Sequence, residues 1–285
     1  MSISLGGVGV WGRSTAWSEI STGERAETIS ELEELGYGAL WLGVSPGDLE
    51  LPEELLAATR RIVVATGIIN IWSNPADLVT AAYHQVYGDH PERILLGLGS
   101  SHAPMVGDAY KRPLSRLRAY LDELDAQESP VPIAHRVLAA LGPKALALAA
   151  ERAAGAHPYL VTPDHTRIAR ETMGPGALLA VEQKAVLESD PVRARELARA
   201  RVGPYMALPN YTNNLLRLGF AEADFADAGS DRLLDALVAW GEEDAILARV
   251  REHREAGADH VCLQVLNGAV PREQWRRLAP ALGGA

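Results

Sequence analysis

The sequence of 285 residues contains a single cysteine, Cys262, so no disulfide can form within the chain. A cysteine-poor sequence is typical of a reducing compartment. Cys262 falls in the apolar run HVCLQVL at 260–266, and we expect it to be a small buried side chain in a strand. No apolar run approaches the ~20 residues that a membrane-spanning helix needs. The first residues, MSISLGGVGVWG, contain no basic segment and no apolar stretch of signal-peptide length. We therefore expect a cytoplasmic protein that spans no membrane.

Basic residues are also in deficit, with 27 Lys and Arg against 37 Asp and Glu, which gives a formal net charge of −10. This balance argues against nucleic acid and against anionic membrane surfaces as partners, because both need a basic face. The eight histidines show no metal-ligand spacing, and the sequence has no Gly-x-Ser-x-Gly motif. We therefore expect neither a metal site nor a hydrolase.

Alternating strand and helix signals run along the whole chain. The third strand signal, IVVATGIINI at 62–71, is the strongest, because it is β-branched and apolar on both faces. Helix signals with caps or first-turn prolines separate the strands, and a helical run is also predicted over 231–240. The predicted strands span residues 3–11, 38–43, 62–71, 94–100, 135–142, 156–162, 178–188 and 260–266.

Eight β/α units predict an α/β protein with a (β/α)₈ TIM barrel as one domain over residues 1–285. An open doubly wound sheet is the rival, but the glycine-rich segment 6–12 has no helix directly after it. The stretch 190–258 is too long for one crossover helix. We expect it to be a helical insertion between strands seven and eight that caps one end of the barrel.

Functional residues of such barrels lie at the carboxyl ends of the strands. No pair of carboxylates falls at these positions, which are rich in glycine and aromatic residues. A site poor in acids and bases suits a cofactor that brings its own chemistry. From their positions at or near strand ends, we predict that Trp11, Trp72 and Ser45 line a substrate pocket.

The segment ATGIINIWSNP at 65–75 resembles the third strand of the luciferase-like oxidoreductase family, and especially of its members that depend on the deazaflavin coenzyme F420. In that family a non-proline cis peptide makes a bulge that supports the ring system of the cofactor. Matched residue by residue, the bond is Gly67–Ile68, with Asn70 close behind.

Four further segments extend the resemblance over nearly the whole chain. RILLGLGSSH at 93–102 is similar to the fourth strand and its exit, which implies that Ser100 and Ser101 contact the cofactor and that His102 contacts or protonates the reacting centre. ALGPKAL at 140–146 is similar to the fifth strand and the following helix start, where a phosphate binds. LPNYTNNLLRLGF at 208–220 and GADHVCLQVL at 257–266 also look like a deazaflavin-dependent subgroup. The resemblance implies that the cofactor tail is lined by Ala140, Leu141, Gly142, Pro143 and Thr162.

The chain also departs from the family. Some members carry an acidic residue and a histidine after the second strand, where this chain has Gly43-Val44-Ser45. A basic cluster after the fourth strand either meets the anionic tail of a deazaflavin or forms a solvated helix face. The cluster consists of Lys111, Arg112, Arg116 and Arg118.

The leading hypothesis is an F420-dependent oxidoreductase that transfers a hydride between the deazaflavin and a small organic substrate. One alternative is an FMN-dependent monooxygenase on the same barrel. Another is a barrel that binds a flavin or deazaflavin and catalyses nothing, because the acid–histidine pair is missing. The resemblance further implies a homodimer that pairs through helices near the second and third strands.

Overall fold

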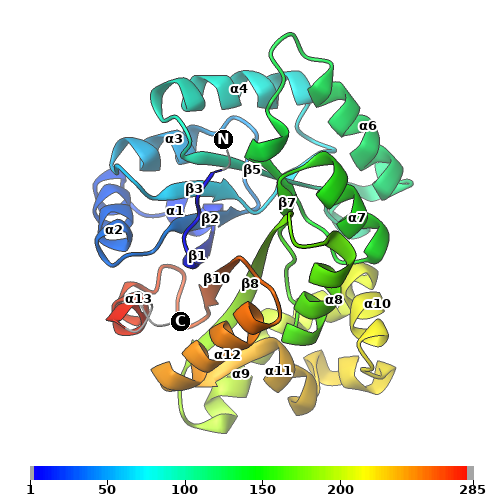
Figure 1. The fold of residues 1–285 in the computed structure, drawn as a ribbon. Helices are drawn as coiled ribbons and strands as arrows, with labels where there is room; N and C mark the ends of the chain where they lie inside the picture. Colours follow the sequence, from blue (N-terminus) through cyan, green and yellow to red (C-terminus); the bar gives the residue numbers. More distant parts are fainter. Residues whose placement is uncertain (1–2, 281–285) are drawn as a thin grey trace.

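The computed structural model describes residues 3–280 and contains a closed parallel barrel surrounded by helices (Figure 1). Every paired strand is parallel to its neighbours, and β10 closes the barrel by pairing with both β1 and β8. The barrel strands are β1 (Val8–Arg13), β2 (Ala39–Gly43), β3 (Val63–Thr66) with β4 (Ile69–Asn70), β5 (Ile94–Gly99), β6 (Arg136–Leu138), β7 (Gly155–Ala156), β8 (Leu178–Leu187) and β10 (His260–Val265). The predicted TIM barrel is confirmed.

Helices cover the outside of the barrel, and their apolar residues pack with the outward-facing residues of the strands in one large core. Caps of the predicted kind are present, and the Ser21 hydroxyl, for example, accepts from the Glu24 N–H at the start of α2. The outer helices are α2 (Thr22–Glu34), α3 (Glu50–Ala57), α4 (Ala76–Asp89), α6 (Pro113–Asp125), α7 (Pro143–Arg152), α8 (Pro163–Met173), α12 (Glu243–Glu255) and α13 (Arg272–Leu278).

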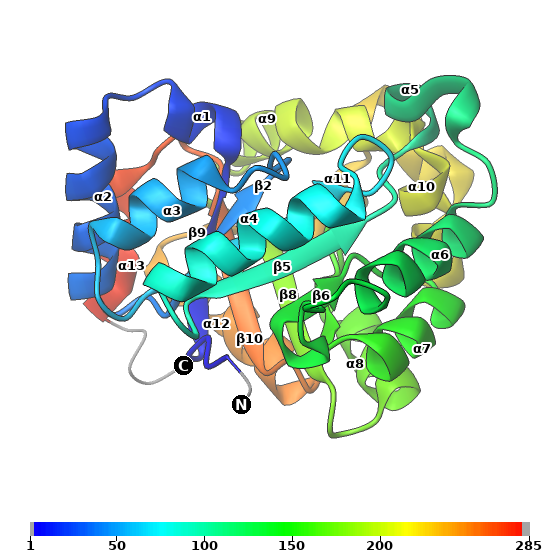
Figure 2. The same ribbon diagram turned by 90° about the horizontal axis from the view of Figure 1, so that it is seen from above.

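A second group of helices lies at the end of the barrel where the strands finish. Figure 2 shows α1, α5 and α9 along one edge of the molecule. The helices between β8 and β10 form a separate apolar cluster with Leu160, Val186 and Leu266, which follow or end strands. The group comprises α1 (Ser14–Ser18), α5 (Ala103–Val106), α9 (Pro191–Val202), α10 (Pro209–Arg217) and α11 (Asp231–Leu237), with 3₁₀ turns η1 (Gly107–Ala109), η3 (Gly203–Ala207) and η4 (Glu222–Ala228). Within the stretch 190–258, α12 instead packs outside the barrel against β8 and β10.

The structure corrects the predicted elements in two places. The helix predicted over 231–240 ends at Leu237, and Val238–Gly241 form a strand, β9, beside the end of β8. The run LLDALVAW has helical apolar periodicity, but β8 is ten residues long and offers its last residues for pairing, so tertiary pairing decides. Of the strand predicted over 135–142 only Arg136–Leu138 is observed, and of that predicted over 156–162 only Ala156, because the chain then leaves the ladder to line a cavity.

The barrel interior holds large side chains in contact. The Trp41 ring stacks on the His157 ring at 4.0 Å between centroids, and its indole N–H meets His260 Nε2 at 3.1 Å. Cys262 is fully buried among them, as its strand pattern predicts, and burial raises the pKa of its thiol. The interior of the barrel around Trp41 is therefore a packed core rather than a channel.

Candidate functional site

A cavity of about 720 Å³ opens at the carboxyl ends of the strands, under α9, η3 and α10. Strand ends supply one part of its wall and the segment between β8 and β10 supplies the other. Ten residues singled out from the sequence line it. They are Trp11, Gly67, Ile68, Asn70, Ser100, Ser101, His102, Ala140, Leu141 and Gly142.

Four other predicted site residues lie outside the lining of this cavity. The Ser45 hydroxyl is buried and donates to the Leu42 carbonyl at 2.6 Å. The Thr162 hydroxyl caps α8, which turns it toward the outer helices. Trp72 lies behind the wall, where its indole N–H donates to the Ser100 carbonyl at 2.7 Å. Pro143 is the first residue of α7, and its neighbours Leu141 and Gly142 line the cavity instead.

The floor of the cavity is the break between β3 and β4. The peptide bond between Gly67 and Ile68 is cis, as the resemblance implies. The Ile68 side chain lies over β5, where a Cβ added at Gly99 would be 2.9 Å from Ile68 Cγ1. A Cβ added at Gly67 would lie 2.9 Å from the Trp11 indole nitrogen. Close packing on both sides therefore requires glycine at 67 and 99 and fixes the position of Ile68.

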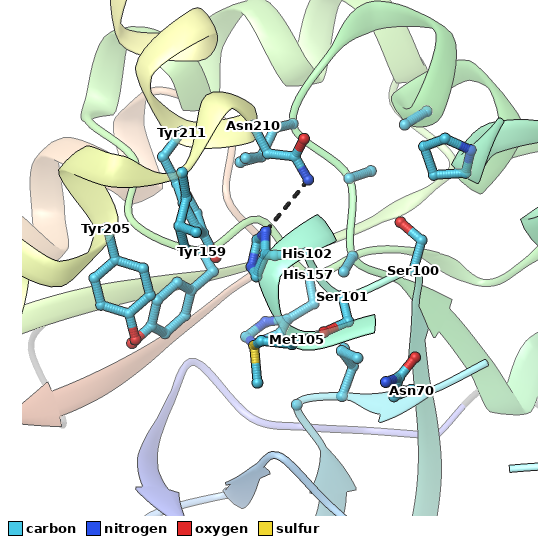
Figure 3. Close-up of a pocket in the computed structure, with 18 of the residues that line it drawn as sticks. Asn70, Ser100, Ser101, His102, Met105, His157, Tyr159, Tyr205, Asn210 and Tyr211 are labelled. Atoms are coloured by element: carbon cyan, nitrogen blue, oxygen red, sulfur yellow. Dashed lines mark hydrogen bonds between the residues drawn. The ribbon is translucent and has the colours of Figure 1, made fainter. Parts of the chain in front are cut away.

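His102 stands between the two parts of the wall, just before α5. Its Nδ1 lies 3.4 Å from the amide nitrogen of Asn210 on α10, and its ring centroid is 5.1 Å from that of Tyr211 (Figure 3). Burial lowers the pKa of His102. The imidazole is therefore neutral at neutral pH, with one nitrogen that accepts and one that donates.

The start of α7 forms a site suited to an anion. Gly142 precedes this ten-residue helix, and a Cβ added there would be 3.6 Å from Arg217 Nη2. The guanidinium of Arg217 also donates to the side-chain oxygen of Asn214 at 3.2 Å. The positive end of the helix dipole and a guanidinium both favour a negatively charged group here.

Arginine supplies the positive charge of the cavity. Arg13 and Arg201 line it together with Arg217, and within residues 3–280 no Asp or Glu belongs to the lining. The basic cluster predicted after the fourth strand does not contribute to this described lining. One of its members, Arg116, instead forms an ion pair with Glu123 at 2.6 Å. A chain with a net charge of −10 thus keeps its carboxylates away from this cavity.

An aromatic group that sequence reasoning did not find lines the opposite part of the wall. Tyr159 follows β7, Tyr205 lies in η3 and Tyr211 in α10, and neighbouring rings among them have centroids 5.1–6.2 Å apart. The Tyr159 hydroxyl bonds with the Tyr205 hydroxyl and the Gln264 side chain, each at 2.9 Å. Burial raises the pKa of Tyr159 and of Tyr211. The segment LPNYTNN contained the only sequence signal, and it came through the resemblance alone.

A buried ion pair lies beneath this aromatic group. Lys184 Nζ is 3.0 Å from a Glu182 carboxylate oxygen, and both side chains are almost completely buried. The second carboxylate oxygen accepts from the Leu160 backbone at 3.0 Å. Lys184 Nζ also lies 3.7 Å from the centroid of the Tyr159 ring, which is a cation–π contact. The pair therefore fixes the loop that carries Tyr159.

Three buried histidines have strongly lowered pKa values because burial penalises the charged imidazolium. The pKa is about 4 for His157 and His260 and about 3 for His253. We call them the low-pKa histidines. His157 also lines the cavity, and its Nδ1 meets the Ala180 carbonyl at 2.9 Å. All three are neutral at neutral pH.

Residues 3–280 offer neither a metal-binding cluster nor a membrane-spanning helix. They contain no group of three or more His, Cys, Asp or Glu side chains placed to hold a metal ion. No helix in the same range is both long and apolar enough to cross a bilayer.

Solved structures with the same fold include enzymes that use either cofactor class. An F420-dependent secondary alcohol dehydrogenase, in complex with an F420–acetone adduct, shares 13% identity over 99% of both chains with a TM-score of 0.73. The coenzyme F420-dependent tetrahydromethanopterin reductase from Methanopyrus kandleri shares 14% identity over 99% of this chain and 100% of its own, with a TM-score of 0.68. The oxygenating constituent of 3,6-diketocamphane monooxygenase from Pseudomonas putida, in complex with FMN, shares 13% identity over 96% of both chains with a TM-score of 0.66.

Identities this low show the fold alone. A comparison with curated protein sequences found no match. The family model for luciferase-like monooxygenase matches residues 3–260, which span all the barrel strands described above up to the first residue of β10. By this match the chain belongs to the luciferase-like monooxygenase family, a family of oxidoreductases.

Proposed function

We propose that the protein is an F420-dependent oxidoreductase that transfers a hydride between the deazaflavin and a small organic substrate. One observation carries the proposal. A single wall of the cavity runs from the Gly67–Ile68 floor to the start of α7 beside Arg217, and the described lining holds no carboxylate. A flat ring and an anionic tail fit such a wall at its two ends.

The cofactor side of the cavity would be formed by small and aliphatic residues. Gly67 and Ile68 would support the ring, and Ala140 to Gly142 with Arg217 would hold the phosphate. When bound, the deazaflavin would supply the hydride chemistry, as an obligate hydride carrier without oxygen chemistry.

His102 would bind the reacting group of the substrate. With the Asn210 amide N–H directed at Nδ1, the neutral imidazole carries its proton on Nε2 and can donate it as a hydrogen bond into the cavity. Since burial lowers the pKa of His102, it would act as a neutral donor rather than as an imidazolium. This role replaces the acid–histidine pair that is missing after the second strand.

The number of arginines favours F420 over FMN. One phosphate, as in FMN, needs only the site at α7 and Arg217, whereas Arg13 and Arg201 also line the cavity and form no ion pair within residues 3–280. The longer anionic tail of a deazaflavin gives these arginines a partner. An FMN-dependent monooxygenase is the second candidate, because one structural relative binds FMN on the same fold.

We further propose a cytoplasmic homodimer. The single cysteine is a buried thiol, which agrees with a reducing compartment. The apolar residues Leu55 and Leu56 of α3 are buried in the core of the protomer, so they do not supply the dimer surface. Light scattering on the purified protein tests the dimer through its mass.

Titration of the purified protein with F420 and with FMN, followed by tryptophan quenching, tests the proposed function. We expect micromolar binding of F420 and at least about tenfold weaker binding of FMN, a difference of about 1.4 kcal/mol. Preferred binding of FMN, with oxygen uptake when reduced FMN and substrate are supplied, would establish the monooxygenase instead. Binding of neither cofactor would favour a barrel without this chemistry.

A further inference from the structure

The cavity has two chemically different sides. Figure 3 shows Tyr159, Tyr205 and Tyr211 together on one side of His102, and Asn70 and Ser100 on the other. The proposed function places the cofactor on the side built from strand ends. The aromatic side therefore remains for the substrate, and its chemistry indicates what that substrate is.

The aromatic side offers ring surfaces, and two of its three tyrosine hydroxyls are already bonded within the protein. The hydroxyls of Tyr159 and Tyr205 bond to each other, and that of Tyr159 bonds also to Gln264. Their hydrogen-bonding capacity is thus largely used within the protein. The rings themselves line the cavity, with Tyr159 and Tyr205 half-buried. Trp11 extends this surface, since its ring centroid is 5.2 Å from that of Tyr159.

The rings are held rigidly in a mixture of tilted and edge-to-face contacts. Tyr205 and Tyr211 cross at 84° with centroids 5.1 Å apart, so one presents an edge where the other presents a face. Lys184, which lies outside the described lining, contacts the Tyr159 ring and fixes its orientation. Rings held at such angles to one another can contact both the face and the edge of a planar ligand.

Clusters of aromatic rings often bind cations, but the charges here exclude that use. The Lys184 ammonium already lies 3.7 Å from the Tyr159 ring centroid and 5.5 Å from that of Tyr205, and the described lining holds no carboxylate to balance a second positive charge beside these rings. A cationic guest would be repelled. A neutral or anionic guest would not.

We propose that the aromatic side, defined by Trp11, Tyr159, Tyr205 and Tyr211, binds a planar conjugated ring that is neutral or anionic. The inference rests on the proposed function, because the cofactor must occupy the other side. It names the substrate class of the same site: a cyclic conjugated acceptor or its reduced form, rather than a short aliphatic alcohol or an amine.

Calorimetric titration of the F420-saturated protein tests the proposal with three probes of similar size. They are 2-naphthoate, its saturated counterpart decalin-2-carboxylate, and 2-naphthyl-trimethylammonium. We expect 2-naphthoate to bind about tenfold more tightly than the saturated acid, and the cation to bind most weakly. Equal affinity for the two acids, or tightest binding of the cation, would overturn the proposal.

Variants at Tyr205 separate stacking from hydrogen bonding. Tyr205→Leu removes the ring and should weaken 2-naphthoate binding about 3- to 10-fold without changing the affinity for the saturated acid. Tyr205→Phe keeps the ring and should retain the preference. Tyr87→Leu, a change to a partly buried tyrosine on α4 outside the described cavity lining, should also retain it. An equal loss in the Phe and Leu variants would show that the hydroxyl, not the ring, recognises the guest.

The same titrations distinguish failure of this inference from failure of the proposed function. If 2-naphthoate displaces F420, or if Tyr205→Leu weakens F420 binding as much as 2-naphthoate binding, the aromatic side belongs to the cofactor and the inference is wrong, while F420 dependence stands. If F420 does not bind the wild-type protein, the proposed function fails. The probe comparison on the free protein then decides the aromatic side by itself.

Discussion

Replacing Gly99 with alanine tests whether the packing of Ile68 against β5 supports the cofactor. The added Cβ would lie 2.9 Å from Ile68 Cγ1 and 3.0 Å from the Ala139 Cβ. The closest ordinary carbon contact is about 3.5 Å, so one of these groups must move by about 0.6 Å. Both residues line the cavity, but the Ala139 Cβ is fixed to a backbone whose N–H donates to the Leu98 carbonyl at 2.9 Å, whereas the Ile68 side chain can rotate. Ile68 should therefore move into the space proposed for the ring.

Overpacking of this size costs about 1–3 kcal/mol of unfolding free energy. For a chain of this length that corresponds to a fall in Tm of roughly 2–12 °C. We expect F420 affinity to fall as well, by about tenfold. Thermal unfolding and fluorescence titration measure the two effects separately. Gly176→Ala is the matched control, because a Cβ added there meets nothing within 4 Å.

Two results would refute this reasoning in different ways. If Gly99→Ala is as stable as the control, the contact between Ile68 and β5 is not tight. If stability falls but the F420 dissociation constant equals that of the control, Ile68 does not support the cofactor, and the ring must lie elsewhere in the cavity.

Three further predictions concern the charged and titratable groups in and beneath the cavity and in the core. Arg217→Gln should weaken F420 binding about tenfold through loss of a charge-assisted hydrogen bond, measured by titration, while Arg118→Gln outside the described cavity lining should change nothing. Lys184→Met should lower the unfolding free energy measured in urea by about 3–5 kcal/mol, because the Glu182 carboxylate is left buried and unpaired. Adding Glu182→Gln should restore part of the lost unfolding free energy. A loss below about 1 kcal/mol in the single variant would contradict this account. The folded pKa of each low-pKa histidine lies below its unfolded value of about 6.5, so their contribution to stability is complete above that pH and is lost as the pH falls toward 4. The loss should reach about 1.4 kcal/mol per pH unit for each histidine, and constant stability between pH 7 and 5 in urea titrations would exclude it.

The barrel was predictable because its signals are local. Apolar strand runs, first-turn prolines and helix caps alternate along the chain, and short-range patterns are enough to count eight units. The third strand was found with its break at Gly67–Ile68 because the resemblance supplied it, since a glycine in an apolar strand does not by itself indicate a cis bond. β9 was not predicted because no local signal marks it as a strand. Val238–Gly241 have the apolar spacing of the helix before them, and only pairing with β8 makes them a strand.

The candidate site also has one part that could be predicted from the sequence and one part that could not. The resemblance found the wall from Gly67 to Gly142, and the strand-end rule agrees with it because in a parallel barrel these positions meet at one end whatever their identity. That rule could not find Tyr205 or Tyr211. They lie outside any barrel strand, and they reach the cavity only through the packing of α9, η3 and α10 on the end of the barrel. Tyr159 was assigned to a strand that ends three residues earlier, at Ala156. Position in the fold, not residue type, makes these three tyrosines part of the site.

The two sides of the cavity differ in how they are fixed, and this difference bears on function. The cofactor side depends on backbone: glycines at 67 and 99 and the start of α7 leave little freedom for substitution. The aromatic side depends on side chains from β1, from the segment after β7 and from the segment between β8 and β10, held by a buried ion pair and by a hydroxyl contact between Tyr159 and Tyr205. Changes on that side would alter the guest while leaving the cofactor site intact. If the proposed function holds, a barrel built this way would keep one redox chemistry while its substrate varied, and for that reason we argue the substrate class from Tyr159, Tyr205 and Tyr211 rather than from the fold.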